Sequence, residues 1–249
     1  MPYRGLVSAI RTLTIVPVLG SEPQNRTAAL PWFAVAGAVI GFVQFGFAES
    51  MRFAPASIMP LAGIFLTVIN YALTGGLHLD GLADTADAFG IRHSRDKTLV
   101  IMKDPHIGSF GVGALVIVLL WRVIVYQEIA IRHAAIWIVF PIIFSRLLQA
   151  LMLCRLPYAR GTEGKAHGFR GTISMTIVLT AQAAALSVIL WQMGGMRLAV
   201  VSTLCGLGVV VPLVATSLRR IGGITGDVAG AVTELFECAF LTGVIACIP

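Results

Sequence analysis

Three aspartates in one short run have the spacing that metal-assisted phosphate chemistry would use. Asp80, Asp84 and Asp87 stand at i, i+4 and i+7, so on a helix they share one face and form a stripe of carboxylates. Small or apolar residues separate most of these positions. Like charges at this spacing repel one another, and carboxylate oxygens are preferred ligands of Mg²⁺, Mn²⁺ and Ca²⁺. The run therefore predicts a divalent-metal site, with a merely solvated helix end as the alternative.

A second acidic cluster lies near the end of the chain. Asp227 and Glu234 are seven residues apart and share a helix face, with Gly230 between them. If the two acidic runs converge, Asp227 joins the three aspartates as a metal ligand. The alternative for Asp227 is a charge at a helix N-terminus, favoured by the helix dipole. Glu237 points away from this face, which favours a structural role.

The expected substrate is a phosphate or diphosphate, because Mg²⁺ usually binds through one or two carboxylates together with substrate phosphates. His78, within the first run, is a candidate base, metal ligand or cap. Cations that would contact the phosphates lie in two loops, although each also suits a role in fixing membrane topology: Lys103, Arg155, Arg160 and Lys165.

Composition indicates a membrane protein. Of the 249 residues, 57% are hydrophobic and 12% are charged, whereas soluble chains average about 45–50% and about 25%. The net charge of +6 is explained by basic loops beside membrane spans, so no nucleic-acid partner is expected. The four cysteines lie in or beside apolar runs and indicate helix packing rather than a disulfide or zinc site.

The elements that must position these residues are membrane helices. A span needs about 20 mainly apolar residues, and the sequence predicts an all-α transmembrane bundle in a single domain, 1–249. A separate N-terminal helix, within the first 20 residues, should lie in the interface or pack shallowly on the bundle. Seven segments qualify as spans: 30–48, 56–77, 109–130, 134–152, 172–194, 197–217 and 224–248.

Basic residues predict the orientation. With the N-terminus in the cytoplasm, 13 basic residues fall on that side and 3 on the other, a strong bias for this topology. The two longest loops, 78–108 and 153–171, fall on the same side. The active site is therefore expected to face the cytoplasm, in the cytoplasmic (inner) membrane, with lipid as a partner.

Several motifs resemble the cobalamin synthase (adenosylcobinamide-GDP ribazoletransferase) family. The run GGLHLDGLADTAD at 75–87 is similar to the signature of that family, with Ala88 in place of the usual Gly after it. The resemblance extends in order along nearly the whole chain. It includes RTLTIVPV at 11–18, PWF at 31–33, MKD at 102–104 and GITGD at 223–227.

The resemblance implies a Mg²⁺-dependent membrane transferase. Adenosylcobinamide-GDP would react with α-ribazole or its 5′-phosphate, giving adenosylcobalamin or its 5′-phosphate and GMP. Asp80, Asp84, Asp87 and Asp227 would hold Mg²⁺ against the diphosphate, and His78 or Glu234 would accept the proton of the attacking hydroxyl. The substrate-binding residues would be Lys103, Asp104, Arg155, Arg160 and Lys165. The sequence does not determine whether the protein forms a homo-oligomer.

Two other functions fit parts of the pattern. A CDP-alcohol phosphatidyltransferase also uses spaced aspartates on membrane helices, but its usual Asp-x-x-Asp-Gly-x-x-Ala-Arg motif is not matched at 80–88. A cation transporter would place its acids at the bilayer midplane, with access from both sides. The aspartate triad instead begins at the end of a predicted span.

Overall fold

The computed structural model describes residues 3–21, 23, 25–161, 169 and 171–249. It confirms the predicted all-α class. The described residues form no strand, only an isolated bridge between Tyr158 and Ile224. The α-helices are α1 (Tyr3–Leu13), α2 (Phe33–Ser50), α3 (Ala62–Thr74), α4 (Leu77–Gly90), α5 (Arg95–Ile101), α6 (Ser109–Ile131), α7 (Val139–Arg155), α8 (Ile173–Ile221) and α9 (Gly226–Ile245). The short 3-10 helices are η1 (Arg26–Trp32), η2 (Met51–Phe53), η3 (Met59–Leu61) and η4 (Ala135–Ile138).

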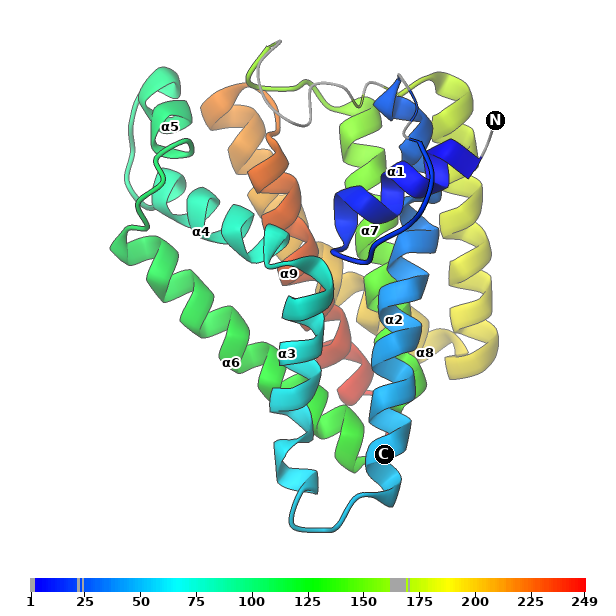
Figure 1. Cartoon of the computed structure of the whole chain (residues 1–249). Coiled ribbons are helices and arrows are strands. Elements are labelled where there is room, and N and C mark those ends of the chain that lie inside the picture. Colours follow the sequence, from blue (N-terminus) through cyan, green and yellow to red (C-terminus); the bar gives the residue numbers. More distant parts are fainter. Residues whose placement is uncertain (1–2, 22, 24, 162–168, 170) are drawn as a thin grey trace.

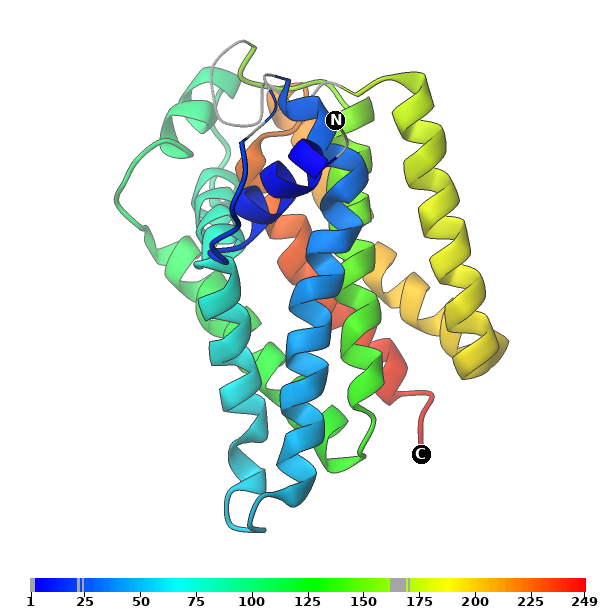
Figure 2. The same cartoon turned by 45° about the vertical axis from the view of Figure 1, so that its right-hand side comes forward.

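Within the described residues, five helical segments are long and apolar enough to cross a membrane, or six if the bent pair α3–α4 forms one span. The predicted spans 172–194 and 197–217 are joined in α8, where Gly195 has a non-helical backbone with φ 76° and ψ 169°. Figure 2 shows the two halves of α8 meeting at a sharp turn. Counting α8 as two spans that meet at Gly195 gives six candidate spans in the described residues, or seven if α3–α4 also forms one.

Helix α9 forms the core of the bundle. Most of its side chains are buried, and it packs against α4, α6, α7 and α8 (Figure 1). It is apolar on nearly all faces, as expected of a helix with neighbours all round. The position of α9 matters for function because its first turn carries Asp227.

The chain turns sharply between α3 and α4. Gly75 and Gly76 adopt left-handed φ angles of 61° and 70°, a conformation that glycine adopts without steric cost. Helix α3 ends at Thr74, short of the predicted boundary at 77, and α4 leaves at 92° to it. We therefore place α4 outside the membrane-spanning segments.

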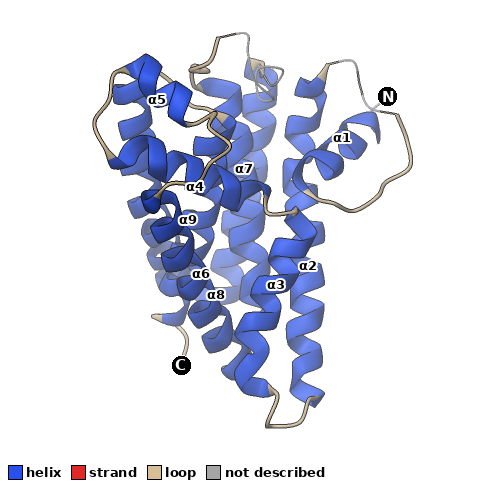
Figure 3. Ribbon diagram, turned by 60° about the vertical axis from the view of Figure 1, so that its left-hand side comes forward, coloured by secondary structure: helices blue, strands red, loops and turns tan. Residues whose placement is uncertain are grey.

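Helices α1, α4 and α5 lie toward the same end of the bundle (Figure 3). The opposite end holds the connection 51–61. Helix α1 has 11 residues, too few to span a bilayer, and it packs on η1 and α2. The prediction of a short N-terminal helix on the bundle is confirmed.

Candidate active site

Helix α4 carries the first acidic run and is helical throughout, from Leu77 to Gly90. Asp80 is exposed at the surface, whereas Asp84 and Asp87 are half-buried. The three aspartates therefore lie on one helix, at the spacing that places them on one face.

Two glycines bring the second acidic cluster against α4. A Cβ added to Gly81 would lie 2.7 Å from the carbonyl oxygen of Asp227, and one added to Gly230 would lie 3.2 Å from the Cα of His78. Thr225 caps α9 by accepting a hydrogen bond from Val228 N at 3.2 Å. This close crossing of α4 and α9 places Asp227 beside the acidic face of α4.

The electrostatics of the cluster are clearest at Asp84. Partial burial, followed by the nearby charges of Asp227 and Asp80, raises the pKa of Asp84 to about 7. Arg160 opposes this shift. Burial and the neighbouring carboxylates thus both disfavour the ionised form of Asp84, and a bound cation would favour it.

Asp87 has a different environment. Its Oδ2 accepts a hydrogen bond from Gly108 N at 2.7 Å, and its Oδ1 accepts one from Gly111 N at 2.8 Å. Both carboxylate oxygens thus bind backbone N–H groups at the start of α6, where unpaired helix donors favour an acceptor. In this structure Asp87 anchors α6 to α4.

Arg160 forms an ion pair with Asp227. Its Nη2 lies 2.8 Å from Asp227 Oδ2 and also donates to the Met102 carbonyl at 3.2 Å. Backbone hydrogen bonds between Ile224 and residues 157 and 159 position the Arg160 loop. A Cβ at Gly223 would lie 2.3 Å from the Pro157 carbonyl, so this approach requires glycine.

Three cavities surround these groups. The largest, of about 520 Å³, is lined by residues that include His78, Asp80, Gln149, Arg160 and Asp227. The second, of about 410 Å³, shares Arg160 with the first, and the third, of about 250 Å³, shares Asp80 with it. Lys103 lines the second and third cavities. The shared residues make the three cavities neighbouring parts of one site.

The remaining predicted substrate contacts are distributed unevenly. Asp104 lines the smallest cavity, and hydrogen bonds from His106 lower the pKa of its carboxyl group. Arg155 is exposed at the end of α7 and is not among the residues lining these cavities. Lys165 lies outside the described residues.

His78 and Gln149 form a polar part of the wall of the largest cavity. Their exposed fractions are 1% and 7%, and their Nε2 atoms lie 3.5 Å apart. Neither His78 Nδ1 nor Gln149 Oε1 has a hydrogen-bond partner within the described part of the chain. Sequence reasoning missed Gln149, although a polar residue within an apolar span is itself a signal of function.

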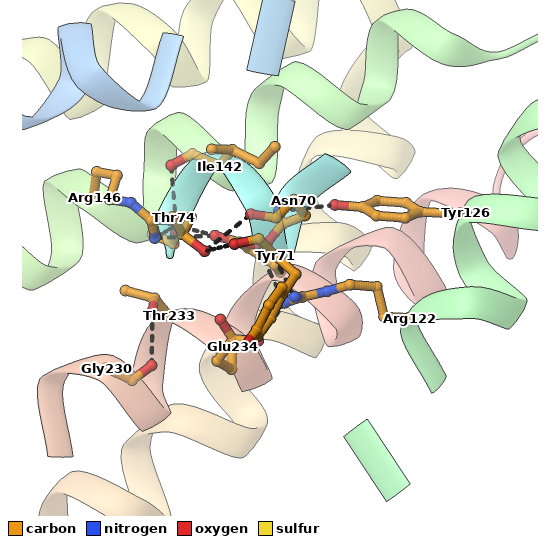
Figure 4. A network of polar contacts seen from close by, with 12 residues as sticks. Asn70, Tyr71, Thr74, Arg122, Tyr126, Ile142, Arg146, Gly230, Thr233 and Glu234 are labelled. Carbon is orange, nitrogen blue, oxygen red and sulfur yellow. Dashed lines mark hydrogen bonds and ion pairs between the residues drawn. The ribbon is translucent and has the colours of Figure 1, made fainter. Parts of the chain in front are cut away.

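Glu234 lies in the bundle interior, away from the lining of the three cavities. It is 2% exposed and pairs with Arg122 at 2.5 Å, while Asn70 accepts from Arg122 at 3.1 Å (Figure 4). Glu237 pairs with Arg146 at 3.1 Å. The signal for these pairs was the presence of opposite charges within predicted spans.

The described residues contain no group of three His, Cys, Asp or Glu side chains arranged to hold a metal ion. Asp80 and Asp84 nevertheless line the same cavity. Since Mg²⁺ commonly uses one or two carboxylates and completes its shell with phosphates and water, this donor set fits an ion shared with a substrate.

The chain is similar to known proteins along most of its length. A family described as cobalamin-5-phosphate synthase matches residues 5–245. The adenosylcobinamide-GDP ribazoletransferase of Chlorobaculum parvum is 40% identical over 242 residues, covering 94% of this chain and 92% of the relative. The protein of the same name from Chlorobium phaeobacteroides is 37% identical, with 94% of each chain covered.

A relative from another genus is also similar to this chain. The adenosylcobinamide-GDP ribazoletransferase of Pseudomonas syringae pv. syringae is 36% identical over 225 residues, with 88% of each chain covered. No solved structure matches this chain.

Proposed function

This chain belongs to the cobalamin-5-phosphate synthase family, and from that membership we propose that it is an adenosylcobinamide-GDP ribazoletransferase. It transfers the adenosylcobinamide phosphate group to α-ribazole or its 5′-phosphate and releases GMP. The observation that carries this proposal is the meeting of α4 and α9 at Gly81. That crossing places carboxylates and Arg160 around one set of cavities, which suits transfer at a diphosphate.

The proposed cofactor is Mg²⁺, held by Asp80 and Asp84 with Asp227 beside them. Both Asp80 and Asp84 line the smallest cavity, and the pKa of Asp84 is raised to about 7 by burial first and by the neighbouring carboxylates of Asp227 and Asp80 second. When bound, the ion would neutralise charge on the phosphate oxygens. Asp87 supports this site by fixing the start of α6.

The chain's own cations position the donor. Lys103 lines the two smaller cavities, and Arg160 lines the two larger ones. Guanidinium and ammonium groups bind phosphate oxygens through charge-assisted hydrogen bonds. These residues would therefore orient the phosphorus of the corrinoid arm toward the acceptor.

His78 is the proposed proton acceptor. A ribose hydroxyl of α-ribazole forms the new P–O bond, the anhydride P–O bond breaks toward GMP, and the hydroxyl proton passes to the His78 imidazole. His78 lines the largest cavity, whereas the Glu234 carboxylate is engaged by Arg122 in the interior. The geometry therefore favours His78 over Glu234.

The site is proposed to face the cytoplasm from the inner membrane. Helix α1 carries Arg4 and Arg11, and α5 carries Arg95 and Lys97, all of the predicted cytoplasmic side. Both helices lie toward the same end of the bundle (Figure 3). Positive residues mark cytoplasmic ends, and the water-soluble substrates are then accessible from that side.

The test is a transferase assay with protein in nanodiscs, adenosylcobinamide-GDP, α-ribazole 5′-phosphate and Mg²⁺, with GMP and corrinoid product measured. Asp84→Asn should lower turnover by at least about a hundredfold, as loss of transition-state charge stabilisation typically does. Asp96→Asn is the matched control, because Asp96 lies on α5 with its side chain 91% exposed. A stable wild-type protein without metal-dependent product would refute the proposal.

A further inference from the structure

We propose that the largest cavity is the subsite of the nucleoside acceptor, with its aromatic base against Phe33 and Phe169 and its ribose against His78 and Gln149. This inference rests on the proposed transferase function. It adds a division of the site into an acceptor pocket and a donor pocket, and it assigns a role to Gln149 as a binding residue.

The cavity has the size and lining that a nucleoside needs. Its volume is about 520 Å³, within the range of about 300–1,000 Å³ that small-molecule pockets occupy. Phe33 and Phe169 form part of the wall, and their rings pack edge-to-face with the ring centroids 5.8 Å apart. Leu13, Leu153 and Tyr158 add further apolar surface. An aromatic base is the part of either substrate that such a wall accommodates best.

The polar part of the same wall is built for a ligand. Gln149 and His78 are more than nine-tenths buried, and both line this cavity. A buried amide or imidazole atom without a partner costs stability, yet Gln149 Oε1 and His78 Nδ1 have none in the described residues. Both atoms are enclosed, so each side chain must rotate toward the cavity before the hydroxyl groups of a ribose, which donate and accept, can satisfy them.

Different residues serve the donor. Among the described residues, the smallest cavity is lined by Asp80, Asp84 and Lys103 but by no aromatic side chain other than that of His106, which suits a metal-bound diphosphate better than a neutral base. Asp80 lines both this cavity and the largest one. The acceptor hydroxyl beside His78 and the donor phosphorus beside Asp84 would therefore approach each other across Asp80.

The test separates the two subsites by binding rather than turnover. Purified protein in nanodiscs is dialysed to equilibrium against α-ribazole without metal or donor, and separately against adenosylcobinamide-GDP with Mg²⁺. Gln149→Leu should weaken α-ribazole binding about tenfold, the effect of losing one well-buried hydrogen bond, while donor binding changes less than about twofold. Asp84→Asn should give the reverse pattern.

Controls make each outcome decisive. Gln149→Met, which keeps the length of the side chain, is measured in parallel, and retained donor binding shows that a variant is folded. The proposal is overturned if the folded wild type does not bind α-ribazole, or if both Gln149 variants bind it normally or lose the donor instead. A wild type that shows this binding pattern without turnover would refute the transferase reaction and retain the nucleoside pocket.

Discussion

Arg160 faces the Asp227 carboxylate, the proposed acceptor cavity and the second cavity, which shares Lys103 with the donor pocket. Its guanidinium lies 2.8 Å from Asp227 and lines the two larger cavities. A divalent ion and a guanidinium compete for the same carboxylate charge. In the proposed reaction, metal binding would release Arg160 from Asp227 and leave it for the donor phosphates.

Arg160→Gln should therefore have opposite effects on two ligands. We expect Mn²⁺ binding to the substrate-free protein, measured by electron paramagnetic resonance, to become several-fold tighter because Asp227 is no longer paired. Donor binding, measured by equilibrium dialysis, should weaken. Arg155→Gln is the matched control, since Arg155 is exposed and does not line the three cavities. Weaker Mn²⁺ binding by a folded Arg160→Gln protein would contradict this exchange.

Asp84 predicts a pH dependence. Its pKa is raised from 3.8 to about 7 by burial and by neighbouring carboxylates, so between these values the folded state binds more protons than the unfolded state. Stability without metal should therefore fall as pH rises from about 4 to about 7. Metal affinity should rise over pH 6–8, as Asp84 ionises.

The measurement is a series of thermal melts across this pH range, with and without Mg²⁺. The wild type without metal should lose more stability with rising pH than Asp84→Asn does, and Mg²⁺ should stabilise the wild type most at pH 8. Identical pH profiles for the two proteins without metal would show that Asp84 does not titrate in this range.

At single residues, sequence reasoning located charges better than partners. The i, i+4, i+7 spacing was enough to place Asp80 and Asp84 on one helix face, because that face depends only on local helical geometry. Asp87 anchors α6 through a hydrogen bond to Gly108, which is 21 positions away in the sequence. Arg160 pairs with Asp227, which is 67 positions away. Such contacts depend on how the helices pack, which a single sequence does not contain.

At the scale of elements, the close crossing of α4 and α9 is what brings the residues of the site together. Gly81 allows the α4 backbone to approach Asp227. Gly81→Ala should push the helices apart and destabilise the protein by about 1–3 kcal/mol, as overpacking typically does, with a larger fractional loss of metal binding than of helix content. Circular dichroism and metal titration measure the two effects.

Gly113→Ala is the control for this substitution. A Cβ at Gly113 meets nothing within 4 Å, and alanine is the better helix former by about 1 kcal/mol. It should leave metal binding unchanged and the melting temperature equal or higher. If Gly81→Ala behaved like Gly113→Ala, close packing at the crossing would not be what sets the site.

The membrane spans were predictable because the hydropathy of each segment indicates a span without any knowledge of how the helices pack. The break at Gly195 was predicted, since it falls between the expected spans 172–194 and 197–217. The sharp turn at Gly75–Gly76 was not, because glycine in an apolar run is compatible with either a continuous or a turned backbone. Those breaks give α4 its 92° turn and divide α8. They determine which helix faces meet, and hence the shape of the site.

For the molecule as a whole, the charges within the bundle hold helices together. Arg122 on α6 pairs with Glu234 on α9, and Arg146 on α7 pairs with Glu237 on α9. Two cations and two carboxylates give this interior cluster no net charge. Removing one member leaves an unpaired buried charge, which costs about 3–5 kcal/mol.

This cluster yields a test of whether Glu234 has a structural or a chemical role. Arg122→Met alone should strongly destabilise the protein, because Glu234 is then left without its 2.5 Å partner. Arg122→Met combined with Glu234→Leu removes one charge of each sign and leaves the Arg146–Glu237 pair intact, so stability in thermal melts should largely recover. The double variant should retain transferase turnover, whereas a stable His78→Asn protein should lose it, because His78 is the proposed proton acceptor. If the double variant folds as well as the wild type but is inactive, Glu234 or Arg122 has a role in the reaction beyond stability.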